Sequence, residues 1–152
     1  MEYLRSGIYV EHGREHQEGV DLATVSRVDL CWYYFLSDLT FVVDGVELAP
    51  PWSWTPVFDF LWSIQRVSAY LERGERCWLG FTENDDLIAF TPEAGKVRIS
   101  CEYATVEAVV EAVCDIAELR DAWMTFRDAV LTELCKEYPR LAANPVLAEL
   151  QV

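Results

Sequence analysis

The sequence predicts a single mixed α+β domain over residues 1–152, in which antiparallel β meanders pack against two main α-helices. Three observations predict this class. Two long stretches have apolar residues at helical spacing, several short segments are rich in β-branched and aromatic residues, and turn-forming residues separate those segments. A hydrophobic fraction of 52% and an aromatic fraction of 13% provide enough apolar surface for folding without a metal or cofactor.

The first strands are predicted between residues 24 and 48. The preceding residues are polar and uneven, and only Ile8–Val10 is predicted to form a short strand there. The apolar run Leu30–Leu36 and the segment Leu39–Val43 have the composition of strands and are predicted to form an antiparallel meander. Two dipeptides are predicted to mark its turns: Ser37-Asp38 and Asp44-Gly45.

The first main helix is predicted over residues 56–73. Thr55 offers a hydroxyl for the N-cap, Pro56 suits the first helical position, and Gly74 is the expected stop. Three more strands are predicted to follow as a second meander, with turns at residues 83–86 and 92–95. These strands are Cys77–Phe81, Leu87–Phe90 and Val97–Tyr103.

The second main helix is predicted over residues 105–138. Thr105 is its expected N-cap, apolar residues recur along one side, and Pro139 ends it. Asn144-Pro145 repeats the combination of a capping residue and a proline. A short terminal helix is therefore predicted to run through Leu150.

The sequence is typical of a cytoplasmic protein. Residues 1–5 lack the basic start and apolar run of a secretory signal, and the longest apolar run has only seven residues, against the roughly 20 that a membrane-spanning helix needs. The five cysteines lack close pairing and zinc-type spacing, so we expect reduced, buried thiols and no metal. Cys31 and Cys101 are predicted in strands, and Cys114 and Cys135 in the long helix; the fifth is Cys77.

The chain is predicted not to be an enzyme, and no catalytic residue is assigned. Residues 12–16 match the H-x-x-E-H arrangement of inverted zinc peptidases, but Gly13 and the polar surroundings are unlike the helix that such ligands need. A solvated loop is the expected structure. Because His12 and His16 are the only histidines, no nucleophile elsewhere has a histidine base. A Gly-rich phosphate-binding loop is also missing.

The net charge of −14 disfavours nucleic acid and anionic membranes as partners and favours a basic protein. Half of this charge lies between Glu83 and Asp121, where ten acidic and three basic residues give −7. On the predicted second helix, four carboxylates at spacings of four, four and three form a ridge along one side. These residues are Glu107, Glu111, Asp115 and Glu118.

Three more carboxylates are predicted at the tip of a hairpin: Glu83, Asp85 and Asp86. The ridge and the tip are the predicted contacts for lysines and arginines of a partner, and the alternative is that they only keep the protein soluble. Trp52 and Trp54 are a further candidate for partner binding, because Trp is enriched at interface hot spots. The alternative for these tryptophans is that they close one end of the core.

Four phrases resemble a family of small, acidic bacterial proteins, from about residue 26 onward. They are Val43-Asp44-Gly45-Val46, the helix entry Trp52-x-Trp54-x-Pro56-Val57-x-Asp59, Phe81-Thr82-Glu83-x-Asp85-Asp86, and Tyr138-Pro139-x-Leu141. The family is associated with the immunity side of bacterial toxin systems. The resemblance implies a toxin-binding protein and implies no catalytic residue.

The predicted function is therefore that of an acidic, non-catalytic immunity protein or antitoxin that occludes a basic toxin. Two other classes stay open. One is a small-molecule sensor or enzyme, whose Trp- and Tyr-lined pocket between sheet and helix would form a concave, largely apolar cavity. The other is a structural subunit that self-associates through a strand edge or an aromatic patch, which its mass in solution would reveal.

Overall fold

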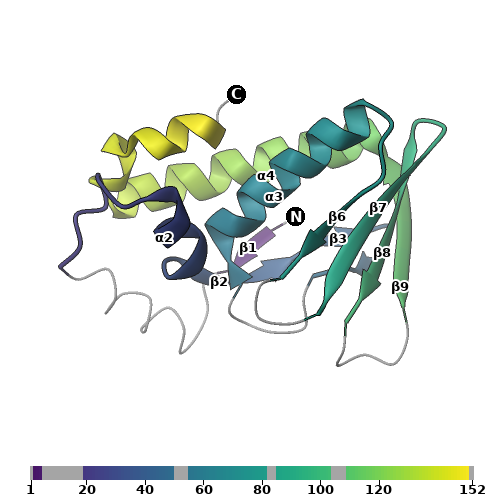
Figure 1. Cartoon of the computed structure of the whole chain (residues 1–152), viewed down its shortest axis with the longest axis horizontal. Helices are drawn as coiled ribbons and strands as arrows, with labels where there is room; N and C mark the ends of the chain where they lie inside the picture. The colour runs from purple at the N-terminus through teal and green to yellow at the C-terminus, as the bar shows by residue number, and fades with distance from the viewer. Residues whose placement is uncertain (1, 5–18, 50–54, 82–84, 104–108, 151–152) are drawn as a thin grey trace.

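The largest sheet of the structure is a four-stranded antiparallel meander. The structure is a computed structural model that describes residues 2–4, 19–49, 55–81, 85–103 and 109–150, without the side chains of residues 2–4. The four strands lie side by side in the order of the sequence (Figure 1). They are β6 (Cys77–Gly80), β7 (Leu87–Glu93), β8 (Lys96–Glu102) and β9 (Val110–Asp115). With the helices that accompany it, this sheet confirms the predicted α+β class.

The meander has one buried face and one face that reaches solvent. Four residues that lie opposite one another across the strands are all buried: Cys77, Phe90, Ile99 and Ala112. On the other face, Trp78 is 67% exposed. The turn Ala94-Gly95 joins β7 and β8 with φ angles of 50° and 88°, the left-handed backbone that a two-residue hairpin loop favours. The three predicted strands are confirmed, and residues 92–93, predicted as turn, extend β7.

Helix α3 (Val57–Glu72) covers part of the buried face and confirms the predicted helix over residues 56–73. Its apolar side is formed by residues at helical spacing that are almost fully buried. The helix ends as predicted: Gly74 has a φ of 70°, its N–H donates to the carbonyl of Leu71, and the N–H of Glu75 donates to the carbonyl of Tyr70. These two bonds satisfy carbonyls that the end of a helix leaves unpaired.

The prediction of a helix over residues 105–138 is wrong at its start. Residues 110–115 form β9, and helix α4 (Ile116–Glu137) begins only after Asp115; residues 105–108 lie outside the described residues. Pairing with β9 satisfies backbone groups along β8, and the two valines of β9 are β-branched, so the strand prevails over the helical periodicity. The end of the helix before Pro139 is as predicted.

The apolar run Leu30–Leu36 was predicted as a strand, and this is wrong for its first part, which lies in helix α2 (Arg27–Trp32). The N–H of Asp29 donates to Oγ of Ser26 at 3.1 Å, and this hydroxyl donates to Oδ2 of Asp29 at 2.7 Å. Such a cap satisfies a backbone donor that would otherwise be unpaired in the first turn. The local cap therefore decides for a helix although the apolar run has the composition of a strand.

Phe35 leads the chain from α2 into strand β2 (Leu36–Thr40). Its φ of 57° is left-handed, which is uncommon for a bulky residue. Its ring is 3% exposed and makes edge contacts with the rings of Phe58 and Tyr138. Its carbonyl accepts the N–H of Val57 at 3.2 Å, so Phe35 also satisfies the first backbone donor of α3.

Strands β1 (Glu2–Leu4), β2 and β5 (Thr55–Pro56) form a small sheet in the order β1-β2-β5. The predicted turn at Ser37-Asp38 is wrong, because both residues lie within β2. Thr55 is not the N-cap of α3: it pairs with Ser37, and Pro56 takes the cap position. Within the described residues, the buried Oγ1 of Thr55 has no hydrogen-bond partner. The predicted strand Ile8–Val10 lies outside the described residues.

A short hairpin of β3 (Val42–Val43) and β4 (Val46–Glu47) packs against β9. Its turn is Asp44-Gly45, as predicted, with φ angles of 50° and 79°. Left-handed values at both positions are those of the two-residue turn that Asp-Gly favours. The hydroxyl of Tyr103 donates to the carbonyl of Leu48 at 2.7 Å and so ties the segment after the hairpin to the end of β8.

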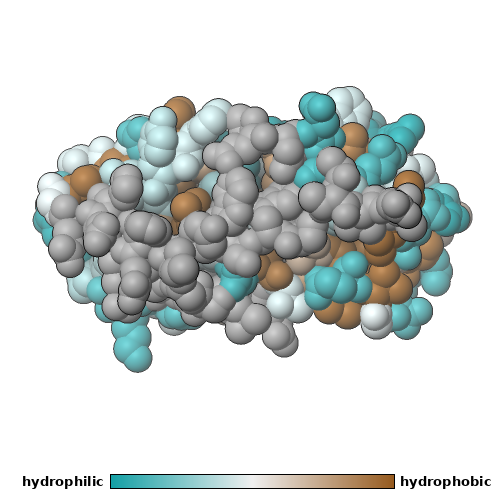
Figure 2. Space-filling view, turned by 90° about the horizontal axis from the view of Figure 1, so that it is seen from below, coloured by the Kyte–Doolittle hydropathy of each residue, from teal (hydrophilic) through white to brown (hydrophobic). Residues whose placement is uncertain are grey.

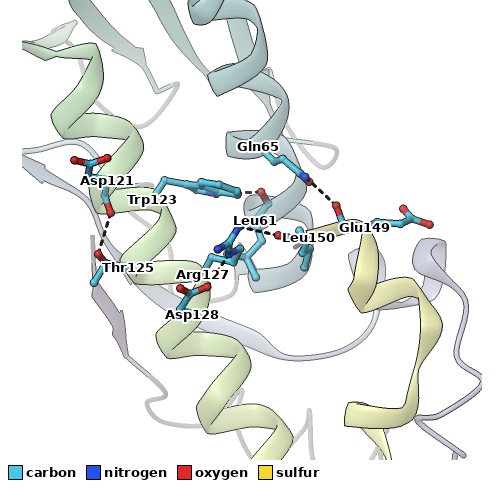
Figure 3. A network of polar contacts seen from close by, with 9 residues as sticks. All are labelled: Leu61, Gln65, Asp121, Trp123, Thr125, Arg127, Asp128, Glu149 and Leu150. Carbon is cyan, nitrogen blue, oxygen red and sulfur yellow. Dashed lines mark hydrogen bonds and ion pairs between the residues drawn. The ribbon is translucent and has the colours of Figure 1, made fainter. Parts of the chain in front are cut away.

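Two 3-10 helices, η1 (Leu141–Ala143) and η2 (Pro145–Leu150), follow α4, and η2 confirms the predicted terminal helix. Figure 3 shows how η2 is held: Gln65 on α3 donates to the carbonyl of Glu149 at 2.8 Å, and Arg127 on α4 donates to that of Leu150 at 3.0 Å. These bonds satisfy carbonyls at the end of η2 and join it to both long helices.

The buried residues of the sheet and of all these helices form one contiguous hydrophobic core. Hydrophobic residues also reach the surface, beside hydrophilic ones, at the end of the molecule that carries the four-stranded sheet (Figure 2). Among the described residues, no helix combines the length and the hydropathy that crossing a membrane requires.

Candidate functional site

An acidic groove lies where the β3–β4 hairpin meets the end of β9 and the start of α4. It encloses about 200 Å³. Two exposed carboxylates, those of Asp44 and Glu118, border it, and its other walls are apolar or thiol side chains. The residues that line the acidic groove are Phe41, Val42, Val43, Asp44, Cys114, Glu118, Leu119 and Ala122.

The local structure fixes both carboxylates. Asp44 takes the first position of the two-residue turn, where Asp tolerates the left-handed backbone. Glu118 lies in the first turn of α4, where the positive end of the helix dipole stabilises a negative charge. In the described part of the chain, neither carboxylate forms an ion pair. The acidic groove therefore presents two exposed carboxylates that no described residue neutralises by an ion pair.

The predicted carboxylate ridge is wrong as a helical feature. Glu111 and Asp115 lie in β9, only Glu118 lies in α4, and Glu107 lies outside the described residues. Glu111 accepts a hydrogen bond from Ser100 at 2.8 Å and lies 3.8 Å from Arg98, so it is engaged on the solvent face of the sheet. The structure thus brings Asp115 and Glu118 near the acidic groove and places Glu111 elsewhere.

The pKa of the Cys114 thiol reflects the negative charge at the acidic groove. Burial raises the pKa of its thiol, and the carboxylates of Glu118 and Asp115 raise this pKa further, whereas Lys96 opposes them. A negative field near the thiol disfavours the thiolate and favours a cation instead. Cys114 was predicted within a helix, and its position in β9 is a correction.

The predicted cluster at the hairpin tip is wrong for one of its members. Asp86 is only 4% exposed, so its carboxylate is not presented on the surface. Asp86 lies two residues before the fully buried Ile88 of β7 and so projects toward the same, buried face of the sheet. Asp85 is exposed, as predicted. Glu83 lies outside the described residues.

The predictions on Trp52, Trp54, His12 and His16 also concern positions outside the described residues.

Sequence reasoning identified Asp44 only as part of a turn and missed it as a site residue. No local pattern could have placed it beside Glu118, because the two are far apart in the sequence and meet only when the hairpin packs on β9.

The cysteines are unsuited to nucleophilic chemistry in this structure. Burial raises the pKa of all five thiols, and a thiol that stays protonated is a weak nucleophile. Cys31, which lies in α2 and not in a strand as predicted, has a pKa raised to about 11 by burial and then by the carboxylate of Asp59, against a lowering effect of Arg27. Within the described residues, no group of three or more metal-ligating side chains comes together.

Asp59→Asn is expected to increase the free energy of unfolding at pH 7. Burial raises the pKa of Asp59, and Arg66 and Arg27 only partly offset this effect. The folded state holds the proton of Asp59 more tightly than the unfolded state does. The stability that this proton contributes is fully present below the ordinary pKa of 3.8 and is lost as the pH rises through the raised pKa of the folded state. Urea unfolding at pH 7 and at about pH 3 measures the effect, which should vanish at the lower pH.

The matched control is Asp85→Asn, which changes an exposed carboxylate that forms no ion pair with a described residue. This variant should leave the free energy of unfolding within about 0.5 kcal/mol of the wild-type value. A loss of stability in Asp59→Asn at pH 7 would contradict the account, because it would mean that the ionised carboxylate stabilises the fold.

Comparison with protein-family models, curated proteins and solved structures finds no match for this chain. The resemblance to immunity proteins stays a prediction that depends on four short phrases. Two of them have structural roles: Val43–Val46 forms the β3–β4 turn, and Tyr138–Leu141 ends α4 and begins η1.

Proposed function

We propose that this protein is a non-catalytic binding protein of the immunity or antitoxin kind, which occludes a basic partner protein. The acidic groove is the proposed centre of the contact surface. The single observation that carries the proposal is the pairing of two exposed carboxylates with an apolar floor, without an ion pair to another described residue.

A lysine or arginine side chain matches both properties of the acidic groove. Its aliphatic stem buries apolar surface while its charged head stays at the polar rim, so the exposed Val42 and the half-buried Ala122 suit the stem. The carboxylates of Asp44 and Glu118 suit the head, because hydrogen bonds between two ionised groups are stronger than neutral ones. The net charge of −14 supports the proposal further, since it attracts a basic protein at long range and speeds the encounter.

The double variant Asp44→Asn, Glu118→Gln is expected to weaken partner binding at least about tenfold, because each lost charged hydrogen bond is worth about 1.5–3 kcal/mol. Asparagine keeps the left-handed turn at position 44 available, so the fold should persist. The measurement is affinity capture from extracts of the native host at about 50 and 300 mM salt, since screening weakens charge contacts. The captured protein is then purified and its Kd measured by calorimetry.

The matched control is Glu72→Gln, Glu102→Gln, which changes the net charge equally at two exposed positions away from the acidic groove. We expect the control to retain the captured partner with nearly unchanged Kd. Equal losses in the two double variants would reject the acidic groove as the centre of binding. Capture of no basic protein at either salt concentration would reject the proposed function.

A further inference from the structure

A second cavity, of opposite chemistry, lies between α3 and the edge strand β6. It encloses about 400 Å³, twice the volume of the acidic groove, and is lined by Arg66, Tyr70, Arg76, Cys77 and Trp78. We call it the arginine pocket. Two guanidinium groups and two aromatic rings in one cavity are unexpected in a chain with 26 acidic and 12 basic residues.

The two elements supply the pocket in a simple way. Arg66 and Tyr70 are four residues apart on α3 and so project from the same side of the helix. Arg76 and Trp78 flank Cys77, which is buried with its thiol 3.9 Å from the carbonyl of Val67 on α3. Because side chains alternate along a strand, Trp78 lies on the side opposite to Cys77 and is 67% exposed.

The ion pairs of the molecule set these two arginines apart. Six described arginines each pair with a carboxylate: Arg27, Arg73, Arg98, Arg120, Arg127 and Arg140. Arg66 and Arg76 form no ion pair with any described residue, although Arg66 lies near enough to Asp59 to lower the pKa of that carboxyl. Of the described arginines, the two that form no ion pair with another described residue therefore line one cavity.

We propose that the arginine pocket binds a small organic anion that carries a flat ring. Arg66 and Arg76 hold its phosphate or carboxylate group, since the guanidinium fork matches the geometry of both anions. The indole of Trp78, which is 67% exposed, stacks on the ring, whereas the Tyr70 ring carries the guanidinium of Arg73 over one of its faces at 4.6 Å. The proposal goes beyond the acidic groove and does not depend on it.

The dimensions favour a small molecule over a peptide. A volume of about 400 Å³ lies within the range of roughly 300–1,000 Å³ that is usual for small-ligand pockets. A peptide strand that extended the sheet would have to pair with β6, which has only four residues and offers few backbone groups. The pocket also has the Tyr and Trp lining that the sequence suggested for a small-molecule site, but its two arginines make it less apolar than that prediction, and Trp78 projects from the face of β6 that points away from α3.

The test is calorimetric titration of the full chain with adenosine monophosphate, indole-3-acetate, adenosine and inorganic phosphate. We expect one-to-one binding of at least one ring-bearing anion with a Kd of roughly 1 mM or tighter, and binding of adenosine and of inorganic phosphate at least about tenfold weaker. Arg66→Gln, Arg76→Gln and Trp78→Ala should each weaken the anion at least about tenfold. Thermal unfolding verifies that these variants of exposed residues stay folded.

The matched controls are Arg120→Gln and Trp32→Phe, which change an exposed arginine and an exposed tryptophan outside the arginine pocket. Both should leave the Kd unchanged. The proposal would be overturned if neither ring-bearing anion saturated the protein below about 5 mM, or if the control variants lost as much affinity as the pocket variants. None of these variants touches Asp44 or Glu118, so failure here and failure of partner capture are separate results.

Discussion

Phe35→Ala is expected to lower the free energy of unfolding by about 3–5 kcal/mol, as truncation of a buried aromatic ring does. The ring is 3% exposed and lies 5.3 Å from that of Tyr138 and 5.4 Å from that of Phe58, measured between centroids. Its removal leaves a cavity where the end of α4 meets α2 and α3, and the rigid helices around it cannot collapse into that cavity. Urea unfolding monitored by far-UV circular dichroism measures the loss.

The backbone at position 35 makes this prediction more specific. With a φ of 57°, phenylalanine and alanine both incur the steric cost that a Cβ atom has in the left-handed region, and glycine does not. Phe35→Gly should therefore be at least as stable as Phe35→Ala, the reverse of the usual order. Trp32→Ala, at a 48% exposed position in the same segment, should change stability much less. A loss below 1 kcal/mol for Phe35→Ala would contradict the packing described here.

Asn144→Ala is expected to cost about 2–4 kcal/mol, because it leaves buried carbonyls without their donor. Asn144 is 3% exposed, and its Nδ2 donates to the carbonyls of Leu22 at 2.8 Å and of Val25 at 2.9 Å. Its Oδ1 accepts the N–H of Val146 at 3.0 Å. Every polar atom of this side chain is thus engaged, and no water can replace it without a cavity.

Asn144→Asp should cost more than Asn144→Ala at pH 7, because it places a carboxylate oxygen against two carbonyl oxygens. The difference should shrink at about pH 3, where the carboxyl is protonated and can again donate one hydrogen bond. Ala143→Asp introduces the same charge at the neighbouring exposed position and should stay within about 0.5 kcal/mol of the wild type. If Asn144→Asp were no worse than this control, the contacts of Nδ2 could not be stabilising.

The elements that could be predicted from the sequence are those with local physical causes. Gly74 ends α3 and Asp44-Gly45 forms a turn because these residues adopt left-handed backbone easily, and both positions have it. Strand β9 could not be found in this way, because its spacing of apolar residues suits a helix and only its pairing with β8 makes it a strand. Helix α2 has a local cap at Ser26, but the β-type composition of the apolar run hid it.

The candidate sites were less predictable than the fold. The acidic character of the chain was visible in its composition, yet Asp86 is buried and Glu111 is engaged with Ser100 and Arg98. Asp44 and Glu118 meet only through packing between distant segments. The arginine pocket likewise requires α3 and β6 to lie together, and no spacing in the sequence shows which of the described arginines form no ion pair with another described residue.

The contacts of Asn144 join residues that are 122 and 119 positions apart in the chain. During translation, the ribosome must therefore extend the nascent polypeptide by more than a hundred residues before the loop around Leu22 can accept its hydrogen bonds from Asn144. The strands of the meander β6 to β9 can pair as they are synthesised, because each strand pairs with the one made just before it. The four-stranded sheet can therefore form during synthesis before Asn144 is available to hold the loop around Leu22.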